Sequence, residues 1–371
     1  MRNQFQWREG NKVDLLVDGE AFFPVMLDEI KKSRHSLLLE FYFVTSGVIA
    51  DKFIVELISA AQRGVMVKLI VDGFGSYRFS SADRARLEKV GAQIVTYNPL
   101  HLSKLTRNFA RDHRKLLVVD QRIAFIGGTG LSDVYWLSEE QGCPWHEIMA
   151  RVEGPAVTDL VNMYNQLWQR CTAQVLSPGG TLEYRGDSRV RVRTVQGLYQ
   201  QDIKGSFLNR VNSAQDKVWL MTAYFLPSFS MRYALRRAAK RGVDVRLIIA
   251  GPYTDQPWVF HASKRYYSRL LKAGVKIYEY QPRFLHAKMS VVDDWGTMGS
   301  CNLDHWNLRW NLEANIELED SDFVRQMTQV FYDDLHHCQE VIPAVWSCRP
   351  WHRRLKEAIW AWISHLVLKI R

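Results

Sequence analysis

The feature that most constrains this chain is an internal duplication. The segment His113–Asp120 (HRKLLVVD) is matched later in the chain by His286–Asp293 (HAKMSVVD). Both have the form His-x-Lys-x4-Asp, and each is followed by a pair of small residues, Gly127-Gly128 and Gly299-Ser300. One such segment is usually no more than the solvated start of a strand, but two with matching residues and spacing are hard to obtain by chance. The duplication predicts one active site built from two halves.

The spacing within each motif indicates the chemistry. Alternate residues of a β-strand point to the same face, so His113 and Lys115 should converge, as should His286 and Lys288. An imidazole can act as a nucleophile or a proton carrier near neutral pH. A neighbouring ammonium group can hold a phosphoryl oxygen. The motifs therefore predict a site that works on a phosphate.

The last residue of each motif, Asp120 and Asp293, completes the candidate catalytic set. Each aspartate follows its histidine by seven residues and should lie on the opposite strand face. We therefore interpret the two aspartates as structural anchors at strand ends rather than proton relays. A turn and a second apolar run follow each one, which predicts a β-hairpin. The small residues that end this hairpin are expected to let a phosphate approach the backbone closely.

The two halves also match outside the motifs. Strand-like runs at 38–43 and 67–71 correspond to runs at 220–225 and 245–249, with a helix between them in each half. Glycines at positions 64 and 242 stand where helix C-caps belong. Alternating strands and helices predict an α/β fold with two pseudo-symmetric halves, each a mixed β-sheet flanked by helices, sharing one active site. The Ser-Pro-Gly-Gly cluster at 177–180 predicts the boundary, giving halves of residues 1–180 and 181–346 and a tail of 349–371.

At this level of detail the chain resembles the phospholipase D superfamily and, within it, bacterial cardiolipin synthases of the B type. Further strings that carry the resemblance are 7–12 (WREGNK), 60–65 (AAQRGV) and 303–316 (LDHWNLRWNLEANI). The resemblance covers about residues 7 to 345. It implies transfer of a phosphatidyl group through a phosphohistidine, making cardiolipin from phosphatidylglycerol with phosphatidylglycerol or phosphatidylethanolamine as second substrate. It also implies that His113 is the nucleophile and His286 the acid, an order that the pseudo-symmetry leaves open.

The resemblance implies roles for further residues. Glu147 and Glu313 match acidic positions that orient the two histidines, although either would read as a surface charge by itself. Lys115, Lys288 and Asn302 are expected to hold the non-bridging phosphate oxygens, so that neither a metal ion nor another cofactor is expected. The expected phosphate-binding set is Asn302, Ser300, Gly128 and Thr129.

The first half departs from the family pattern at one position. The Gly-x-Asn pattern is met by Ser300-Cys301-Asn302, whereas the first half has Gly130 where asparagine is expected. Thr129 or Ser132 could supply a hydroxyl group instead, and an asparagine at 130 would be expected to raise the rate. Two other functions stay open: a phosphodiesterase acting on nucleic acid, because the same kind of site serves nucleases of the superfamily, and an inactive membrane-bound paralogue disabled by Gly130.

The net charge of +10 is concentrated in two segments. Residues 349–371 carry a net +5, and residues 100–115, which include ten extra residues relative to the second half, carry a net +4. This distribution fits an anionic lipid surface better than the long basic stripe of a nucleic-acid groove, so no nucleic acid partner is expected. The insert is a candidate contact for lipid headgroups. Apolar residues of the tail recur at helical spacing with Trp360 and Trp362 among basic flanks, which favours an interfacial helix over one packed on the protein's own core.

The remaining sequence features indicate where in the cell the protein is expected to be. The N-terminus lacks the apolar core of a signal peptide, and no window reaches the length of uncharged apolar residues that a spanning helix needs. The five cysteines show no Cys-x-x-Cys spacing, which indicates reduced thiols rather than disulfides or a zinc site. We therefore expect a peripheral protein on the cytoplasmic face of the bacterial inner membrane.

Overall fold

A computed structural model describes residues 5–100, 108–136, 143–177, 179–180, 182–197, 200–302, 304 and 307–350. The strands are β1 (Arg8–Val17), β2 (Ser36–Phe41), β3 (Met66–Asp72), β4 (Gln93–Tyr97), β5 (Lys115–Val119), β6 (Ile123–Gly127), β7 (Ile148–Glu153), β8 (Ser188–Gln196), β9 (Lys217–Thr222), β10 (Asp244–Ala250), β11 (Lys276–Tyr280), β12 (Met289–Val292), β13 (Trp295–Gly299), β14 (Leu312–Leu318) and β15 (Cys338–Glu340). The α-helices are α1 (Gly19–Lys32), α2 (Val48–Gln62), α3 (Ser81–Glu88), α4 (Ala156–Thr172), α5 (Asp202–Ser213), α6 (Phe229–Lys240), α7 (Pro257–Ser263), α8 (Tyr267–Leu271), α9 (Asn307–Trp310), α10 (Ser321–Leu335) and α11 (Pro343–Ser347).

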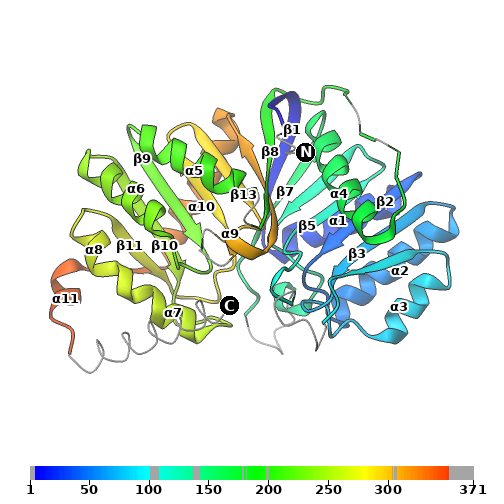
Figure 1. The fold of residues 1–371 in the computed structure, drawn as a ribbon, viewed down its shortest axis with the longest axis horizontal. Helices are drawn as coiled ribbons and strands as arrows, with labels where there is room; N and C mark the ends of the chain where they lie inside the picture. The colour runs from blue at the N-terminus through cyan, green and yellow to red at the C-terminus, as the bar shows by residue number, and fades with distance from the viewer. Residues whose placement is uncertain are drawn as a thin grey trace.

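The strands join into one sheet that runs through both halves of the molecule (Figure 1). In the first half the strand order from the centre outwards is β1-β7-β6-β5-β2-β3-β4. In the second half it is β8-β14-β13-β12-β9-β10-β11, with β15 added at the edge. These orders are the same once the second half is numbered from β8, so the predicted α/β fold with two pseudo-symmetric halves is confirmed. The two halves meet where β1 pairs with β8, in antiparallel register.

Helices cover both faces of this sheet. On one face α4 and α10 pack over the centre, and their apolar residues join both halves in a common core. On the other face α1 and α2 cover the first half and α5 and α6 cover the second, each over its own core. The central strands β1 and β8 keep charged and half-buried residues, whereas β2, β5 and β12 are buried along their whole length. The whole of β2, SLLLEF, is buried, as expected for a strand covered on both faces.

Glycines end the equivalent helices in the two halves, as the sequence predicts. Gly64 follows α2 with a φ of 88°, and Gly242 follows α6 with a φ of 95°. This left-handed conformation strains any residue with a Cβ atom, so glycine is the residue that fits. Each turn leads directly into the next parallel strand, β3 or β10.

The motif aspartates lie at the far ends of the motif strands. Asp120 follows β5, and its carboxylate accepts hydrogen bonds from the backbone N–H groups of residues 34, 35 and 36 at 2.7–2.9 Å. Asp293 follows β12 and accepts from those of residues 215, 216 and 217 at 2.9–3.0 Å. Each carboxylate thus ties its motif hairpin to the start of the neighbouring strand, β2 or β9. This is the geometry of a structural anchor, about 20 Å along the strand from the motif histidine.

The tail lies outside the described residues from position 351 onwards. Among the described helices, none combines the length and the apolar character that crossing a bilayer requires. The part of the basic insert at 101–107 also lies outside the described residues.

Candidate active site

A cavity of about 500 Å³ lies between the two halves, and both motif histidines line it. His113 stands just before β5, and His286 just before β12. Other lining residues follow the carboxyl ends of parallel strands, among them Tyr42 after β2 and Tyr224 after β9. Ligand sites of α/β sheets commonly form at such strand ends. The two motifs, far apart in sequence, therefore meet in one site.

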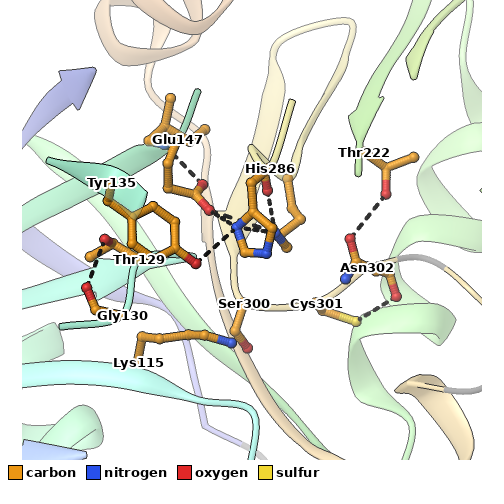
Figure 2. A network of polar contacts seen from close by, with 12 residues as sticks. Lys115, Thr129, Gly130, Tyr135, Glu147, Thr222, His286, Ser300, Cys301 and Asn302 are labelled. Atoms are coloured by element: carbon orange, nitrogen blue, oxygen red, sulfur yellow. Dashed lines mark hydrogen bonds and ion pairs between the residues drawn. The ribbon is translucent and has the colours of Figure 1, made fainter. Parts of the chain in front are cut away.

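Each histidine is paired with a glutamate from the other half. Nδ1 of His113 lies 3.0 Å from Oε1 of Glu313, on β14 of the second half. Nδ1 of His286 contacts Oε2 of Glu147, which precedes β7 of the first half (Figure 2). The resemblance implied that the two glutamates orient the histidines, and each glutamate does lie against one histidine. Nothing in the sequence indicated that the pairs cross between the halves.

The backbone is responsible for this crossing. The N–H of His113 donates to the carbonyl of Leu312 at 2.9 Å, and the N–H of His286 donates to the carbonyl of His146 at 2.8 Å. Leu312 and His146 are the residues immediately before the two glutamates. Short parallel bridges, Asp112 with Leu312 and His146 with Leu285, therefore join each motif to the glutamate segment of the other half.

The glutamates determine which ring nitrogen is available for chemistry. Both carboxylates are fully buried, and both face Nδ1 of their histidine. A proton on Nδ1 that is donated to the carboxylate leaves the lone pair on Nε2. Both imidazoles are thereby held in the tautomer that suits nucleophilic attack, with a carboxylate to stabilise the cation that forms.

The motif lysines lie beside the histidines, as the strand spacing predicts. Lys115 Nζ donates to the carbonyl of His113 at 2.6 Å, and Lys288 Nζ donates to the carbonyl of His286. Lys288 Nζ also lies 2.9 Å from Nδ1 of His286 and 3.6 Å from Oε2 of Glu147. Figure 2 shows the His286 ring beside the Glu147 carboxylate, with the Lys115 side chain approaching from the other half.

Burial shifts the pKa of the motif histidines, the motif lysines and the two paired glutamates toward the value that favours the neutral form. Burial and then the charges of Lys115 and Lys288 hold the pKa of both His113 and His286 well below the usual value. Burial lowers the pKa of Lys115 to about 7 against the opposing effect of Glu313, and it raises the pKa of Glu147 to about 7 and that of Glu313 to about 8. An incoming phosphate anion favours the charged lysines and a protonated imidazole, because a neighbouring negative charge stabilises the cationic form of each group.

Of the expected phosphate-binding residues, Asn302 is the one that keeps an unpaired side-chain donor within the described part of the chain. Its side chain is fully buried, and its Nδ2 has no hydrogen-bond partner within the described part of the chain. By contrast, the Ser300 hydroxyl donates to Glu313, and the Thr129 hydroxyl donates to the carbonyl of Gly130 at 3.2 Å. The Thr45 hydroxyl donates to Oγ of Ser132 at 2.7 Å, and neither Thr129 nor Ser132 is among the described residues that line the cavity.

The glycines of the first half have a packing role that the sequence did not predict. A Cβ atom at Gly128 would lie 2.1 Å from Oε2 of Glu147, and one at Gly127 would lie 2.3 Å from the sulfur of Met149. The missing side chain of Gly128 makes room for the glutamate that contacts His286, and that of Gly127 makes room for Met149. The expectation that a phosphate approaches the backbone here stays a prediction.

Most residues of the cavity lining were not identified from the sequence. Many of them are aromatic, among them Tyr42, Phe43, Tyr135, Trp145, Tyr224 and Trp258. The Tyr135 and Trp145 rings lie 5.6 and 5.3 Å from the His286 ring. Tyr42 and Tyr224 occupy equivalent positions in the repeat, which is the signal that could have identified them. In the described part of the chain, no three or more His, Cys, Asp or Glu side chains form a cluster that could hold a metal ion.

Two histidine–lysine pairs on a duplicated sheet, each backed by a glutamate from the opposite half, define a phosphoryl-transfer enzyme of the phospholipase D type. The family described as cardiolipin synthase, PLD-like domain, matches residues 26–168 and 207–335. Cardiolipin synthase B of Salmonella typhi is 33% identical over 367 residues, covering 95% of this chain and 87% of that protein. Cardiolipin synthase of Geobacillus thermodenitrificans is 32% identical over 365 residues, covering 95% of this chain and 72% of that protein. The chain belongs to the cardiolipin synthase family of the phospholipase D superfamily.

Solved structures show the same fold at low sequence identity. Phosphatidylserine synthase of Haemophilus influenzae Rd KW20 superposes with a TM-score of 0.72 at 12% identity, covering 92% of this chain and 90% of that one. Polyphosphate kinase of Porphyromonas gingivalis superposes with a TM-score of 0.63 at 14% identity, covering 90% of this chain and 49% of that one.

Proposed function

We propose that this protein is a phosphatidyltransferase that makes cardiolipin from phosphatidylglycerol, with phosphatidylglycerol or phosphatidylethanolamine as second substrate. The observation that carries the proposal is the single cavity that receives one glutamate-backed histidine from each half. Two such histidines suit a double displacement, because one can hold the phosphatidyl group while the other handles protons. Membership of the cardiolipin synthase family supplies the product.

In the first step, Nε2 of His113 attacks the phosphorus of the donor lipid. The bond between phosphorus and the headgroup oxygen breaks, and that oxygen takes the proton from Nε2 of His286. Glycerol leaves, or ethanolamine if phosphatidylethanolamine is the donor, and the phosphatidyl group stays on His113. The choice of His113 as nucleophile follows the family resemblance.

In the second step, a glycerol hydroxyl of the acceptor phosphatidylglycerol attacks the same phosphorus. The hydroxyl proton passes to Nε2 of His286, and the bond between nitrogen and phosphorus breaks. Cardiolipin is released, and both histidines return to their starting protonation states. Lys115, Lys288 and the free Nδ2 of Asn302 stabilise the charge on the non-bridging oxygens during both displacements.

The rim of the cavity supports a lipid substrate. Phe74, Tyr77 and Leu100 line the cavity, and these side chains are 50%, 65% and 53% exposed. Exposed aromatic and aliphatic side chains beside a polar site suit a chain-bearing molecule that enters from a bilayer. With the basic insert and tail, this rim supports peripheral binding to an anionic membrane, which we place at the cytoplasmic face of the inner membrane.

The proposal is tested by incubating the purified protein with mixed micelles of labelled phosphatidylglycerol. We expect cardiolipin and free glycerol in equal amounts. His113→Ala and His286→Ala should each reduce the rate by several orders of magnitude, because each removes a reacting group. Acid-labile phosphate retained on the wild-type protein after quenching would report the phosphohistidine.

Other products would decide against the proposal. Phosphatidic acid in place of cardiolipin would make the protein a hydrolase. Cleavage of single-stranded DNA without lipid turnover would favour the nuclease function, and no turnover of either substrate would favour an inactive paralogue.

A further inference from the structure

One cation in the cavity has no assigned role. Arg111 lines the cavity, and its side chain is only 8% exposed. Nη1 donates to the carbonyl of Asn98 at 2.9 Å and lies 3.5 Å from Oδ1 of Asp72. Nε and Nη2 have no partner among the described residues. These two N–H groups form one edge of the guanidinium, the planar fork that binds two phosphate oxygens at once.

Asp72 pairs with only one nitrogen of the Arg111 guanidinium. Its carboxylate accepts hydrogen bonds from the backbone N–H groups of Phe74, Gly75 and Asp112 at 2.8–2.9 Å. Its contact with Arg111 is the longest of the set and involves only Nη1. Leaving buried N–H donors of a charged group unpaired is unfavourable, so the free edge is suited to an anion that enters the cavity.

The position of Arg111 relates this anion to the reaction. Asp112 forms the bridge to Leu312, so the residues on either side of it, Arg111 and His113, point to the same face. Their Cα atoms are about 6–7 Å apart at strand spacing. The equivalent position in the second half, two residues before His286, is Phe284. The extra cation is therefore present on only one side of the site.

We propose that the free edge of Arg111 binds the phosphodiester of the acceptor lipid, whose glycerol hydroxyl attacks the phosphohistidine. In phosphatidylglycerol the attacking hydroxyl and the lipid's own phosphate lie at opposite ends of one glycerol unit, a span comparable to the separation of Arg111 and His113. Anchoring that phosphate places the hydroxyl beside the phosphorus on His113. Arg111 thereby selects an acceptor that carries a phosphodiester over water or a free alcohol. This inference rests on the proposed function.

The test compares three acceptors in reactions with the same phosphatidylglycerol donor. Phosphatidylglycerol has both the phosphodiester and acyl chains, glycerophosphoglycerol has the phosphodiester alone, and labelled glycerol has neither. For Arg111→Gln, the rates with the first two acceptors should fall about tenfold to a hundredfold relative to the rate with glycerol, the range for charged hydrogen bonds. Arg111→Lys keeps the positive charge but loses the two parallel N–H donors. Its rates with the first two acceptors should therefore lie between those of wild type and Arg111→Gln. Arg122→Gln, at an exposed ion pair with Glu183, serves as the unchanged control.

Equal losses with all three acceptors would overturn the inference, because Arg111 would then serve the donor or the fold. Loss with phosphatidylglycerol but not with glycerophosphoglycerol would also overturn it, since the acyl chains would be the feature recognised. Arg111→Gln could fold poorly because the Asp72 carboxylate loses its cation. In that case the double variant Asp72→Asn/Arg111→Gln also removes the negative charge, and the rates with the three acceptors are compared in this double variant. A wild-type protein that transfers to none of the three acceptors would instead refute the proposed function.

Discussion

The two motif histidines have matching surroundings that differ at single residues. Glu313 receives a hydrogen bond from Ser300, whereas Glu147 faces Gly128 at the equivalent position and has Lys288 3.6 Å away. Small differences of this kind can separate the proton affinities of two otherwise equivalent imidazoles. The residues therefore provide a physical basis for dividing the two roles between the histidines.

The crossed pairing gives a prediction for the glutamates. Glu313→Gln should impair the step performed by His113, and Glu147→Gln the step performed by His286, each by roughly 10²–10⁴-fold, because the carboxylate stabilises the imidazolium. A phosphatidyl donor with a nitrophenol leaving group needs no protonation by an acid. Release of nitrophenol should therefore be restored in Glu147→Gln and His286→Ala but stay slow in Glu313→Gln and His113→Ala.

The grouping of the variants is the decisive result. If nitrophenol release stays slow in Glu147→Gln as it does in His113→Ala, the glutamates act on the histidines of their own halves. If release is restored in Glu313→Gln and His113→Ala but stays slow in the other two variants, the crossed pairing holds and the roles of the two histidines are reversed.

Gly130 provides a second residue-level prediction. A Cβ atom at this position would lie 2.3 Å from the backbone carbonyl oxygen of Phe43. Restoring the family asparagine should therefore lower stability by about 1–3 kcal/mol rather than raise the rate, which revises the expectation from sequence. Thermal unfolding of Gly130→Asn is compared with that of Gly205→Asn, where nothing lies within 4 Å of a new Cβ atom. A Gly130→Asn variant that is faster than wild type and equally stable would contradict the prediction that the new side chain clashes with Phe43.

At the scale of elements, the short bridge at His146 joins the two halves through a buried charge cluster. Nδ1 of His146 lies 2.9 Å from Asp18, and Nε2 lies 3.0 Å from Asp334. Arg283 of the second half also contacts Asp18. Although burial lowers it, these two carboxylates raise the pKa of His146 to about 9. The imidazolium is thus a structural cation and lies outside the catalytic pair.

This shift predicts how stability depends on pH. Because folding raises the pKa of His146, its contribution is complete below about pH 6.5 and is lost as the pH rises through about 9. The contribution is roughly 2–4 kcal/mol. The free energy of unfolding from urea titrations between pH 6 and pH 10 should fall more steeply for wild type than for His146→Gln. Parallel curves for the two proteins would show that His146 is not the titrating group.

The elements also show what the sequence could and could not predict. Local patterns repeat within each half, so the strands, the motif hairpins and the glycine helix ends were predictable from periodicity and spacing. The crossing of Glu147 and Glu313 was not, because it depends on two-residue bridges between segments up to 200 residues apart. The roles of Gly128 and Arg111 depend on which atoms lie opposite them, and no local pattern contains that information.

At the scale of the whole molecule, charge compensation predicts independence from metal ions. Lys115 and Lys288 bring two cations to a phosphate that carries a single negative charge, which supplies the stabilisation that a divalent ion would otherwise give. Cardiolipin formation should therefore stay within about twofold of its initial rate after exhaustive dialysis against EDTA. Loss of turnover that one divalent ion restores would contradict this mechanism.

The basic tail gives a prediction for membrane binding. Removing residues 351–371 takes away an amphipathic sequence with basic flanks, in which each Lys or Arg near an anionic surface contributes about 1 kcal/mol. The shortened protein should sediment poorly with phosphatidylglycerol vesicles, and its activity on vesicles should fall more than its activity on detergent-dispersed lipid. Unchanged sedimentation, or loss of the folded state, would show that the tail serves another purpose.

The crossed glutamates also bear on the ancestry of the chain. An ancestor with one motif and this arrangement would have had no histidine backed by a carboxylate until two copies of it associated. Fusion of the two genes would have made that association permanent and, for the first time, allowed the copies to differ. Phe284 opposite Arg111 and Ser300 opposite Gly128 are differences of this kind. Each difference lies near a histidine–glutamate pair that is shared between the two copies. A substitution in one half therefore also alters the surroundings of a catalytic residue that belongs to the other half.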